Sequence, residues 1–427
     1  YKSVSFPLRF MCKYKNKYFL LKYMPTTHLI FKFCLDLRIF CVSLCLMNED
    51  KNIIVGFDAK RVVRNGTGLG AYGRNLVNDL AALYPNAQLL LYAPDAGRED
   101  LARQVKPAPN LRMVYPKNTK NALKKAAWRS GGMVKDLLRD GVQVFHGLSG
   151  ELPKGVKHAG IDAVVTIHDL IFMRHPEFYH WWDALIYRWK FHQTLKEANR
   201  IIAISQCTKR DIMKYGHYPE ERISVIYQSC DTRFRERATP KKLNEVRQRY
   251  ALPSRFVLNV GTIEARKNVL LAVKAMKNVD REVHLVVLGR PTSYINKVKS
   301  WAAHNGLSAR VHFLHNVPNN DLPAIYQQAE VFAYPSRYEG FGIPIIEAIQ
   351  SALPVVACTG SCLEEAGGPH SLYVAPNDHK GMAQAINARL KGQAERDESI
   401  SRSMEYVQRF ENKNVAQQVA QCLFENK

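Results

Sequence analysis

From residue 52 onward, short apolar runs alternate along the chain with longer stretches of mixed polarity. The runs are five to seven residues long and bounded by turn-forming residues, a pattern typical of buried β-strands. In the first half they lie at 52–57, 88–93, 111–115, 142–146, 163–168, 200–205 and 223–227. In the second half they lie at 256–261, 283–289, 311–315, 331–336, 354–358 and 371–375.

This alternation predicts an α/β protein with two doubly wound, Rossmann-like domains. Such domains place a ligand cleft between their facing strand ends. We expect an N-terminal domain at 47–230, a polar connection at 231–253 and a C-terminal domain at 254–401. A helix at 402–427 is expected to pack back on the first domain.

Residues 1–46 differ from the rest, being crowded with Lys, Tyr, Phe and Leu and holding four of the nine cysteines. Their longest apolar stretch, 39–47, is too short to span a bilayer. A signal peptide would carry its apolar core nearer the start. We interpret 1–46 as a non-native or disordered extension; the alternative is a basic arm that associates with membranes.

Composition narrows the class of partner. At 427 residues, 46% hydrophobic and 23% charged, the chain is typical of a globular protein with two cores. The net charge of +23 indicates acidic partners, either nucleic acid, anionic membrane or a phosphorylated substrate; a generally basic surface is the alternative. The cysteines show neither zinc spacing nor a disulfide framework, which fits a reducing compartment.

The stretch YPSRYEGFGIPIIEAIQSALPVVA (334–357) predicts a strand, a glycine loop, a short helix and a second strand. Pro344 suits the first position of the helix, and Pro354 forces the helix to end before it. The free N–H groups of such a helix point at whatever lies above the strand ends. Glu339 on the loop and Glu347 one turn into the helix can therefore reach one ligand.

Two adjacent cations, Arg266 and Lys267, follow the apolar run at 256–261. Above a strand end, Arg as a fork and Lys as a point charge can neutralise a diphosphate. The alternative is a basic pair in solvent beside a helix.

The glycine-rich stretch GTGLGAYG (66–73) contains a formal GxGxxG at Gly68, Gly70 and Gly73, which taken alone would indicate NAD. In a dinucleotide-binding fold the first strand runs straight into the first glycine, whereas here about ten residues intervene. We therefore favour a loop that lets backbone approach a ligand or acceptor; a plain tight turn remains the alternative.

Two further strands end in histidine, at His146 and at His168 followed by Asp169. We expect both ends to face the cleft, the alternative being a structural role in the core. The other histidines form no convincing metal set, and no Asp-x-Asp pair ends a strand, so no metal site is predicted.

Two stretches outside these motifs admit simpler interpretations. The basic segment 117–129 is expected to be a solvated face rather than a helix on an anionic membrane. Trp182, Ile186 and Trp189 recur at helical spacing and are expected to face the core.

From about Asn52 to its end the chain resembles the retaining glycosyltransferases of family 4, which have the GT-B fold. The family's hallmark, two glutamates separated by seven residues, is matched by EGFGIPIIE (339–347). Four other motifs lie in family order and spacing: GTGLGAY, TIHDLIFMRHPEFY, AISQCTKRDI and NVGTIEARKN.

The resemblance implies roles for these residues. Glu339 would contact hydroxyls of the transferred sugar and Glu347 the nucleoside ribose, flanking the diphosphate rather than facing it. Arg266, Lys267 and the turn would hold the diphosphate, with His168 near the reacting carbon. The donor side would comprise Gly261, Gly340, Phe341, Gly342 and Ile343 together with the two glutamates and two cations. The acceptor side or cleft loop would comprise Gly68, Gly70, Tyr72, His146 and Asp169.

The implied enzyme is a metal-independent hexosyltransferase without a cofactor. It would transfer a hexose, preferably mannose, from a GDP- or UDP-linked donor to a glycan or lipid-linked acceptor. We expect a cytoplasmic location, compatible with peripheral contact at an anionic membrane, and no nucleic acid partner. A GT-B-like epimerase or phosphorylase, or a non-catalytic binding protein for membrane or nucleic acid, are the alternatives.

One departure from the family concerns the turn after Glu347, where Ala352 replaces the usual glycine. Alanine is expected to fit only if φ is negative at that position, so the local turn would differ.

Overall fold

The computed structural model describes residues 11–14, 17–20, 53–117 and 121–424. The chain divides into two units, residues 1–51 and 52–427. In the first, β1 (Met11–Tyr14) pairs antiparallel with β2 (Lys17–Leu20). The rest of the predicted extension lies outside the described residues.

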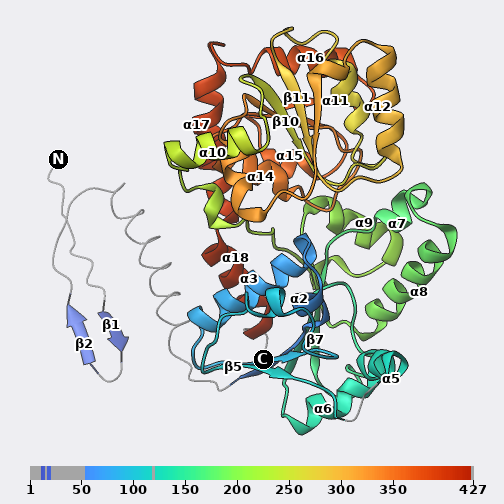
Figure 1. Cartoon of the computed structure of the whole chain (residues 1–427). Helices are drawn as coiled ribbons and strands as arrows, with labels where there is room; N and C mark the ends of the chain where they lie inside the picture. The colour runs from blue at the N-terminus through green and yellow to red at the C-terminus, as the bar shows by residue number, and fades with distance from the viewer. Residues whose placement is uncertain (1–10, 15–16, 21–52, 118–120, 425–427) are drawn as a thin grey trace, which may run out of the picture. The chain divides into compact units, whose positions relative to one another are not determined.

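The second unit contains two parallel sheets with helices packed around them (Figure 1). The first has seven strands in the order β5-β4-β3-β6-β7-β8-β9. Their bounds are β3 (Ile54–Asp58), β4 (Gln88–Tyr92), β5 (Leu111–Val114), β6 (Val144–Gly147), β7 (Asp162–Ile167), β8 (Arg200–Ala203) and β9 (Ile223–Val225). The helices of this domain are α2 (Lys60–Arg64), α3 (Gly68–Leu83), α4 (Glu99–Ala102), α5 (Ala122–Ala127), α6 (Met133–Arg139), α7 (Ile171–Arg174), α8 (Trp181–Glu197) and α9 (Gln206–Gly216).

The second sheet has six strands in the order β12-β11-β10-β13-β14-β15. Their bounds are β10 (Phe256–Val260), β11 (His284–Leu288), β12 (Val311–Leu314), β13 (Val331–Tyr334), β14 (Val355–Cys358) and β15 (Leu372–Val374). The accompanying helices are α10 (Pro240–Arg249), α11 (Val269–Ala275), α12 (Tyr294–His304), α13 (Leu322–Tyr326), α14 (Ile343–Gln350), α15 (Leu363–Gly367), α16 (His379–Asn387) and α17 (Arg396–Tyr406).

The predicted fold class is confirmed, since each predicted apolar run overlaps one of these strands and both sheets are parallel. The strand order reverses between β3 and β6 and again between β10 and β13. At such switch points the loops diverge and leave a crevice above the carboxyl ends of the strands. The loops that carry the candidate site follow these strands.

Helix α18 (Asn412–Phe424) packs against α3 of the first domain (Figure 1). Its residues Val415, Ala416 and Val419 join the core beneath β3 and β4. The segment 231–253 contains a 3-10 turn at Thr232–Phe234 and helix α10. Among the described residues, no helix combines the length and apolar content that a bilayer span requires.

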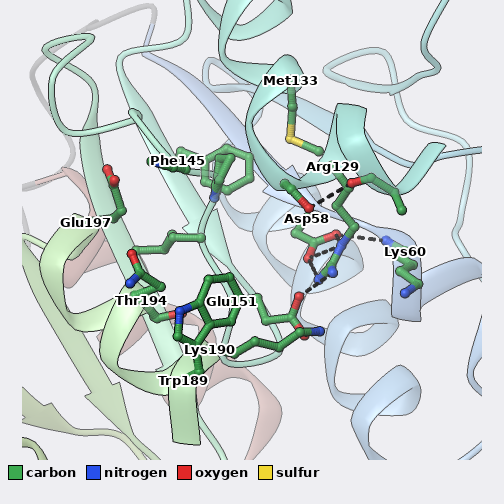
Figure 2. Close-up of a pocket in the computed structure, with 16 residues that line it drawn as sticks. Asp58, Lys60, Arg129, Met133, Phe145, Glu151, Trp189, Lys190, Thr194 and Glu197 are labelled. Atoms are coloured by element: carbon green, nitrogen blue, oxygen red, sulfur yellow. Dashed lines mark hydrogen bonds and ion pairs between the residues drawn. The ribbon is translucent and has the colours of Figure 1, made fainter. Parts of the chain in front are cut away.

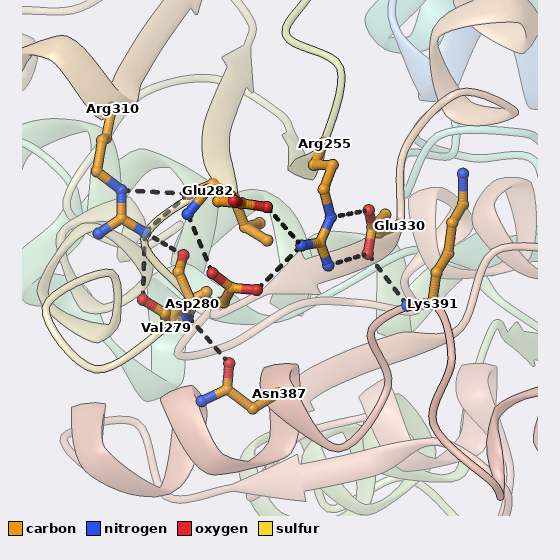
Figure 3. Close-up of polar contacts among 9 residues, drawn as sticks. Arg255, Val279, Asp280, Glu282, Arg310, Glu330, Asn387 and Lys391 are labelled. Carbon is orange, nitrogen blue, oxygen red and sulfur yellow. Dashed lines mark hydrogen bonds and ion pairs between the residues drawn. The ribbon is translucent and has the colours of Figure 1, made fainter.

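Ion pairs fix the amino-terminal edge of the second sheet (Figure 3). Arg255, directly before β10, lies 2.8 Å from Glu330, directly before β13, and 3.0 Å from Asp280. Arg310 donates to the carbonyl of Asp280 at 2.7 Å. Because these contacts lie at the edge opposite the strand ends that bear the site, they hold the sheet without occupying the crevice.

The predicted core-facing stripe of α8 is wrong. Trp182, Ile186 and Trp189 are at least half exposed. The helix instead turns Phe191 inward, where its ring contacts Phe172 at 6.4 Å between centroids. Because both faces of this helix are apolar, spacing alone did not identify the one that packs.

Candidate active site

The loop between β13 and α14 positions the first glutamate. Helix α14 begins at Ile343, one residue before Pro344. Gly342 caps it with φ of 123°, a conformation that side chains rarely adopt. Phe341 is buried, and its ring stacks on Tyr227 at 5.3 Å. Phe341 thereby anchors the loop two residues after Glu339.

Glu339 lies directly on the two cations. Its Oε1 is 2.6 Å from Nζ of Lys267, and its Oε2 is 2.8 Å from Arg266. Burial opposes ionisation, but Lys267 and Arg266 outweigh it and lower the pKa of Glu339 to about 2. The loops after β10 and β13 bring the three side chains together in a direct ion-pair cluster, which the sequence did not predict.

The cation loop after β10 is tied to the glutamate loop by side chain to backbone bonds. Arg266 donates to the carbonyl of Tyr338 at 2.9 Å, and Lys267 donates to the hydroxyl of Tyr334 at 2.8 Å. Gly261 has a φ of 150°. A Cβ added at this glycine would lie 3.7 Å from the side chain of Lys267, so the glycine borders the lysine. Each cation therefore has a hydrogen-bond partner besides Glu339.

Asn268 is a positioning residue that sequence reasoning missed. It adopts a left-handed φ of 54° directly before α11 and donates to the carbonyls of Pro335 and Pro376 at 3.0 and 2.9 Å. The signal was present, because Asn before a helix readily adopts this conformation.

Glu347 lies apart from this cluster, on the first turns of α14. It is half-buried and accepts a hydrogen bond of 2.8 Å from the hydroxyl of Tyr326. Burial raises the pKa of Glu347 to about 7, although Tyr326 and Arg233 lower it. The two glutamates thus differ in protonation near neutral pH, the first ionised and the second titrating.

The N-terminal domain meets this cluster at His168 and Asp169. The ring Nε2 of His168 donates to the carbonyl of Leu148 at 2.8 Å, and Nδ1 accepts from Gln228 at 2.9 Å. Burial lowers the pKa of His168 to about 4. The ring is therefore neutral near pH 7, and each of its nitrogens has a hydrogen-bond partner.

Gly340 allows the two domains to touch at this point. A Cβ added there would lie 2.0 Å from the carbonyl oxygen of His168 and 3.2 Å from Cβ of Asp169. Burial raises the pKa of Asp169, which Arg266 and Lys267 oppose. The strand end at 168–169 therefore meets the loop that carries Glu339.

Most of the glycine-rich stretch is helical and does not form the predicted loop. Gly68 and Gly70 belong to the first turn of α3, and the ten residues before them include helix α2. A Cβ at Gly70 would lie 1.9 Å from the carbonyl oxygen of Asn65, so this glycine permits close packing of two helices. Space around Gly68 is open.

Tyr72 and His146 form part of the interior behind His168. The ring of Tyr72 packs edge-on against His168 at 5.0 Å, and its hydroxyl lies 3.2 Å from Oγ1 of Thr166. His146 contacts the same Thr166 oxygen at 2.8 Å and is fully buried, which lowers its pKa to about 3. The expectation that His146 faces the cleft is wrong, because its side chain points into the domain instead.

Additional contacts between the domains were not foreseen. Glu365 accepts from the backbone N–H groups of Gln206 and Cys207 at 2.6 and 2.9 Å, capping α9 from the other domain. Ser205 donates to the carbonyl of Gly340 at 2.7 Å. Ser205 also caps its own helix, a pattern the sequence contains, but nothing in the sequence indicates a partner across the cleft.

A cavity of about 330 Å³ lies at the carboxyl ends of β3 and β6 (Figure 2). Arg129 bridges Asp58 and Glu151 across it, and Lys190 lies 3.2 Å from Glu151. Trp189 forms part of its lining. Carboxylates, cations and an indole face are groups that recognise a hydroxylated ring. The part of the chain that the structure describes contains no cluster of side chains suited to a metal ion.

Two family models match the chain. The model for glycosyltransferase family 4 covers residues 66–234, and that for glycosyl transferases group 1 covers residues 243–405. O-antigen chain mannosyltransferase B of Escherichia coli is 30% identical over 64% of this chain and 72% of its own length. O-antigen chain mannosyltransferase RfbU of Salmonella typhimurium is 29% identical over 62% of this chain and 69% of its own length.

The fold matches solved glycosyltransferase structures. The crystal structure of Anabaena HepE in complex with UDP aligns with a TM-score of 0.67 and 20% identity, covering 87% of this chain and all of that one. The architecture is that of a GT-B glycosyltransferase. The chain belongs to the group 1 glycosyltransferases, family 4, and is a hexosyltransferase.

Proposed function

We propose that the protein transfers mannose, with retention of configuration, from GDP-mannose to a glycan or lipid-linked glycan. The observation that carries this proposal is the cluster of Glu339, Arg266 and Lys267 at the carboxyl ends of β10 and β13. The two relatives named above as mannosyltransferases support the choice of sugar. The C-terminal domain would bind the donor and the N-terminal domain the acceptor.

On donor binding, we propose, the diphosphate replaces Glu339 as the partner of Arg266 and Lys267. A diphosphate carries more charge than one carboxylate, and Arg266 can bind it through two parallel N–H bonds. As Arg266 and Lys267 turn to the diphosphate, Glu339 is released to accept hydrogen bonds from sugar hydroxyls. The same cations then stabilise the departing nucleoside diphosphate, which itself takes the acceptor proton in a front-face reaction.

Glu347 would accept hydrogen bonds from the ribose hydroxyls. The N–H groups at the start of α14 would face the diphosphate. His168, whose carbonyl meets Gly340, would position the donor loop rather than act as a base. The cavity beside Arg129 and Glu151 would receive the acceptor, at an anionic membrane surface where the acceptor is lipid-linked.

Nucleotide-dependent stabilisation and product analysis test this function. A nucleoside diphosphate at 100 times its dissociation constant should add about 2.7 kcal/mol of stability, a clear rise in Tm. We expect GDP to raise Tm more than UDP, ADP or NAD, and GDP-mannose with a glycan acceptor to give an α-linked product. Stabilisation by NAD alone, or release of free mannose without transfer to any acceptor, would contradict the proposal.

A further inference from the structure

The outward face of α8 is an apolar surface that nothing in the described structure covers. Trp181, Trp182, Leu185, Ile186 and Trp189 are between 47% and 63% exposed. Six of the ten large hydrophobic side chains exposed by the described residues belong to this single helix. In Figure 1 the helix lies at the margin of its domain. We call these five residues the α8 face.

The α8 face has the size of the largest apolar patch that a monomeric protein typically exposes, and such a patch is often functional. With aromatic side chains of roughly 150–250 Å² each about half exposed, it presents on the order of 400 Å² of apolar area. The indoles of Trp181 and Trp182 stack at 3.5 Å between centroids, which concentrates this area at the start of the helix.

Cations surround the α8 face. Arg188 is exposed on the same helix, and Lys190 is 40% exposed one turn from Ile186. Exposed Lys154 lines the same cavity as Trp189, and exposed Lys124 lies on α5, whose Ala126 also lines that cavity. The exposed carboxylates near this face are Asp183 on α8 and Glu177 shortly before the helix.

We propose that the α8 face docks on an anionic lipid bilayer, inserting its indole and aliphatic side chains among the headgroups. This inference deepens the membrane contact proposed above and names the surface that makes it. Residues 52–230 carry 26 Lys and Arg against 16 Asp and Glu, a net charge of +10. Anionic headgroups complement that charge, and Trp is suited to the boundary between headgroup and acyl chain.

A second copy of the chain is the less suitable occupant. Pairing two α8 faces would bring together two domains that each carry a net charge of +10. The bilayer gains from the same charges that would oppose such a dimer.

Co-sedimentation of the full chain with vesicles tests the docking surface. We expect binding to phosphatidylglycerol–phosphatidylethanolamine vesicles that falls as salt rises, with much weaker binding to phosphatidylcholine vesicles. The double substitution Trp182→Glu with Ile186→Glu should weaken partitioning at least tenfold, and Arg188→Glu by a smaller factor. Met404→Glu, at a 38% exposed position on α17, is the matched control and should bind as the unchanged chain does.

All variants retain residues 1–46. Any binding of that segment to vesicles is therefore the same in every variant and does not affect the comparison. Equal partitioning of the double variant and the unchanged chain, or a concentration-dependent dimer abolished by the double substitution, would overturn the inference. Stabilisation by GDP is measured on the same samples. Intact GDP binding without vesicle binding rejects the docking surface alone, whereas vesicle binding without GDP binding rejects the proposed donor site alone.

Discussion

Nζ of Lys267 lies 2.6 Å from Oε1 of Glu339, so a cation expected to hold a phosphate is already neutralised by a carboxylate of the same site. Arg266 completes the cluster at 2.8 Å. A diphosphate must therefore compete with Glu339 for both cations. This competition ties the affinity for the nucleotide to the freedom of the carboxylate.

Replacement of Glu339 by Gln should separate binding from transfer. Without the competing charge, GDP should bind roughly three- to tenfold more tightly, the effect of about 1 kcal/mol. Transfer should slow by about 10²–10³, the loss typical of one preorganised contact at the reacting centre. Calorimetric titration with GDP and a transfer assay measure the two effects. Glu282→Gln, at a largely exposed carboxylate near Arg255, is the control; weaker GDP binding by Glu339→Gln would contradict the exchange of partners.

Glu347 should make stability depend on pH. Its pKa is raised from an ordinary 4.5 to about 7, so the folded protein retains a proton that the unfolded chain releases. The stability from this proton is present in full below pH 4.5 and is lost as pH rises through 7. Glu347→Gln should therefore raise Tm at pH 8 relative to the unchanged chain, by about 2–4 °C per kcal/mol recovered, and much less at pH 5.

The same substitution should weaken GDP binding, because a neutral amide accepts the ribose hydroxyls less strongly than a carboxylate. In the unchanged chain, binding should strengthen as pH rises through 7. An unchanged Tm of Glu347→Gln at pH 8 would show that burial does not raise the pKa of this carboxyl group. An unchanged affinity of the variant for GDP would show that Glu347 does not belong to the donor site.

Ala352→Gly should stabilise the protein. The expectation of a negative φ at Ala352 is wrong: φ is 58°, in the left-handed region. Helix α14 ends in a Schellman turn, with Leu353 N–H bonded to Ala348 and Ala352 N–H to Ile349, each at 2.9 Å. Glycine occupies this position without steric cost, for a net gain of about 0.5–1 kcal/mol.

Thermal unfolding measures that gain. Ala388→Gly is the control, since Ala388 ends α16 with φ of −67° and should lose roughly 0.5–1 kcal/mol through chain entropy. Equal destabilisation by both substitutions would mean that the turn after α14 is not strained.

Gly340→Ala should impair transfer far more than stability. The added methyl would overlap the carbonyl of His168, 2.0 Å away, and push the donor loop from the N-terminal domain. Because displacements of about 1 Å can cost roughly 10²-fold in rate, we expect kcat to fall by that order. Gly132→Ala, where the nearest atom is 3.7 Å away, should leave kcat unchanged. Similar kcat values for both variants would show that the contact with His168 is unimportant.

Local rules predicted most of the fold. The strands followed from apolar runs, and the start of α14 from Pro344, because backbone geometry and burial act over a few residues. The left-handed Ala352 was missed because the intact Schellman hydrogen bonds of the turn outweigh the modest cost to alanine. Local preference correctly indicated that alanine is disfavoured at a left-handed φ. It did not indicate that the hydrogen bonds of the turn outweigh this cost.

The site was predicted as a set of residues but not as a set of contacts. Spacing placed Glu339, Arg266 and Lys267 above the same sheet edge, whereas their ion pairs depend on two loops separated by some 70 residues. His146 and His168 end neighbouring strands, yet the side chain of His146 points into the interior, whereas the carbonyl of His168 meets Gly340 of the other domain. A shift of one residue in strand register moves a side chain from one face of the sheet to the other. The sequence pattern does not define the register to that precision.

The position of α18 affects the order in which the domains can be completed during synthesis. Val415, Ala416, Val419 and Leu423 belong to the core of the domain that begins near residue 53. While the ribosome is still translating the second domain, the partly built first domain exposes the apolar surface of α3 that α18 will cover. Chaperone binding to nascent chains should therefore persist until residues 412–424 have emerged, long after β9 has left the exit tunnel.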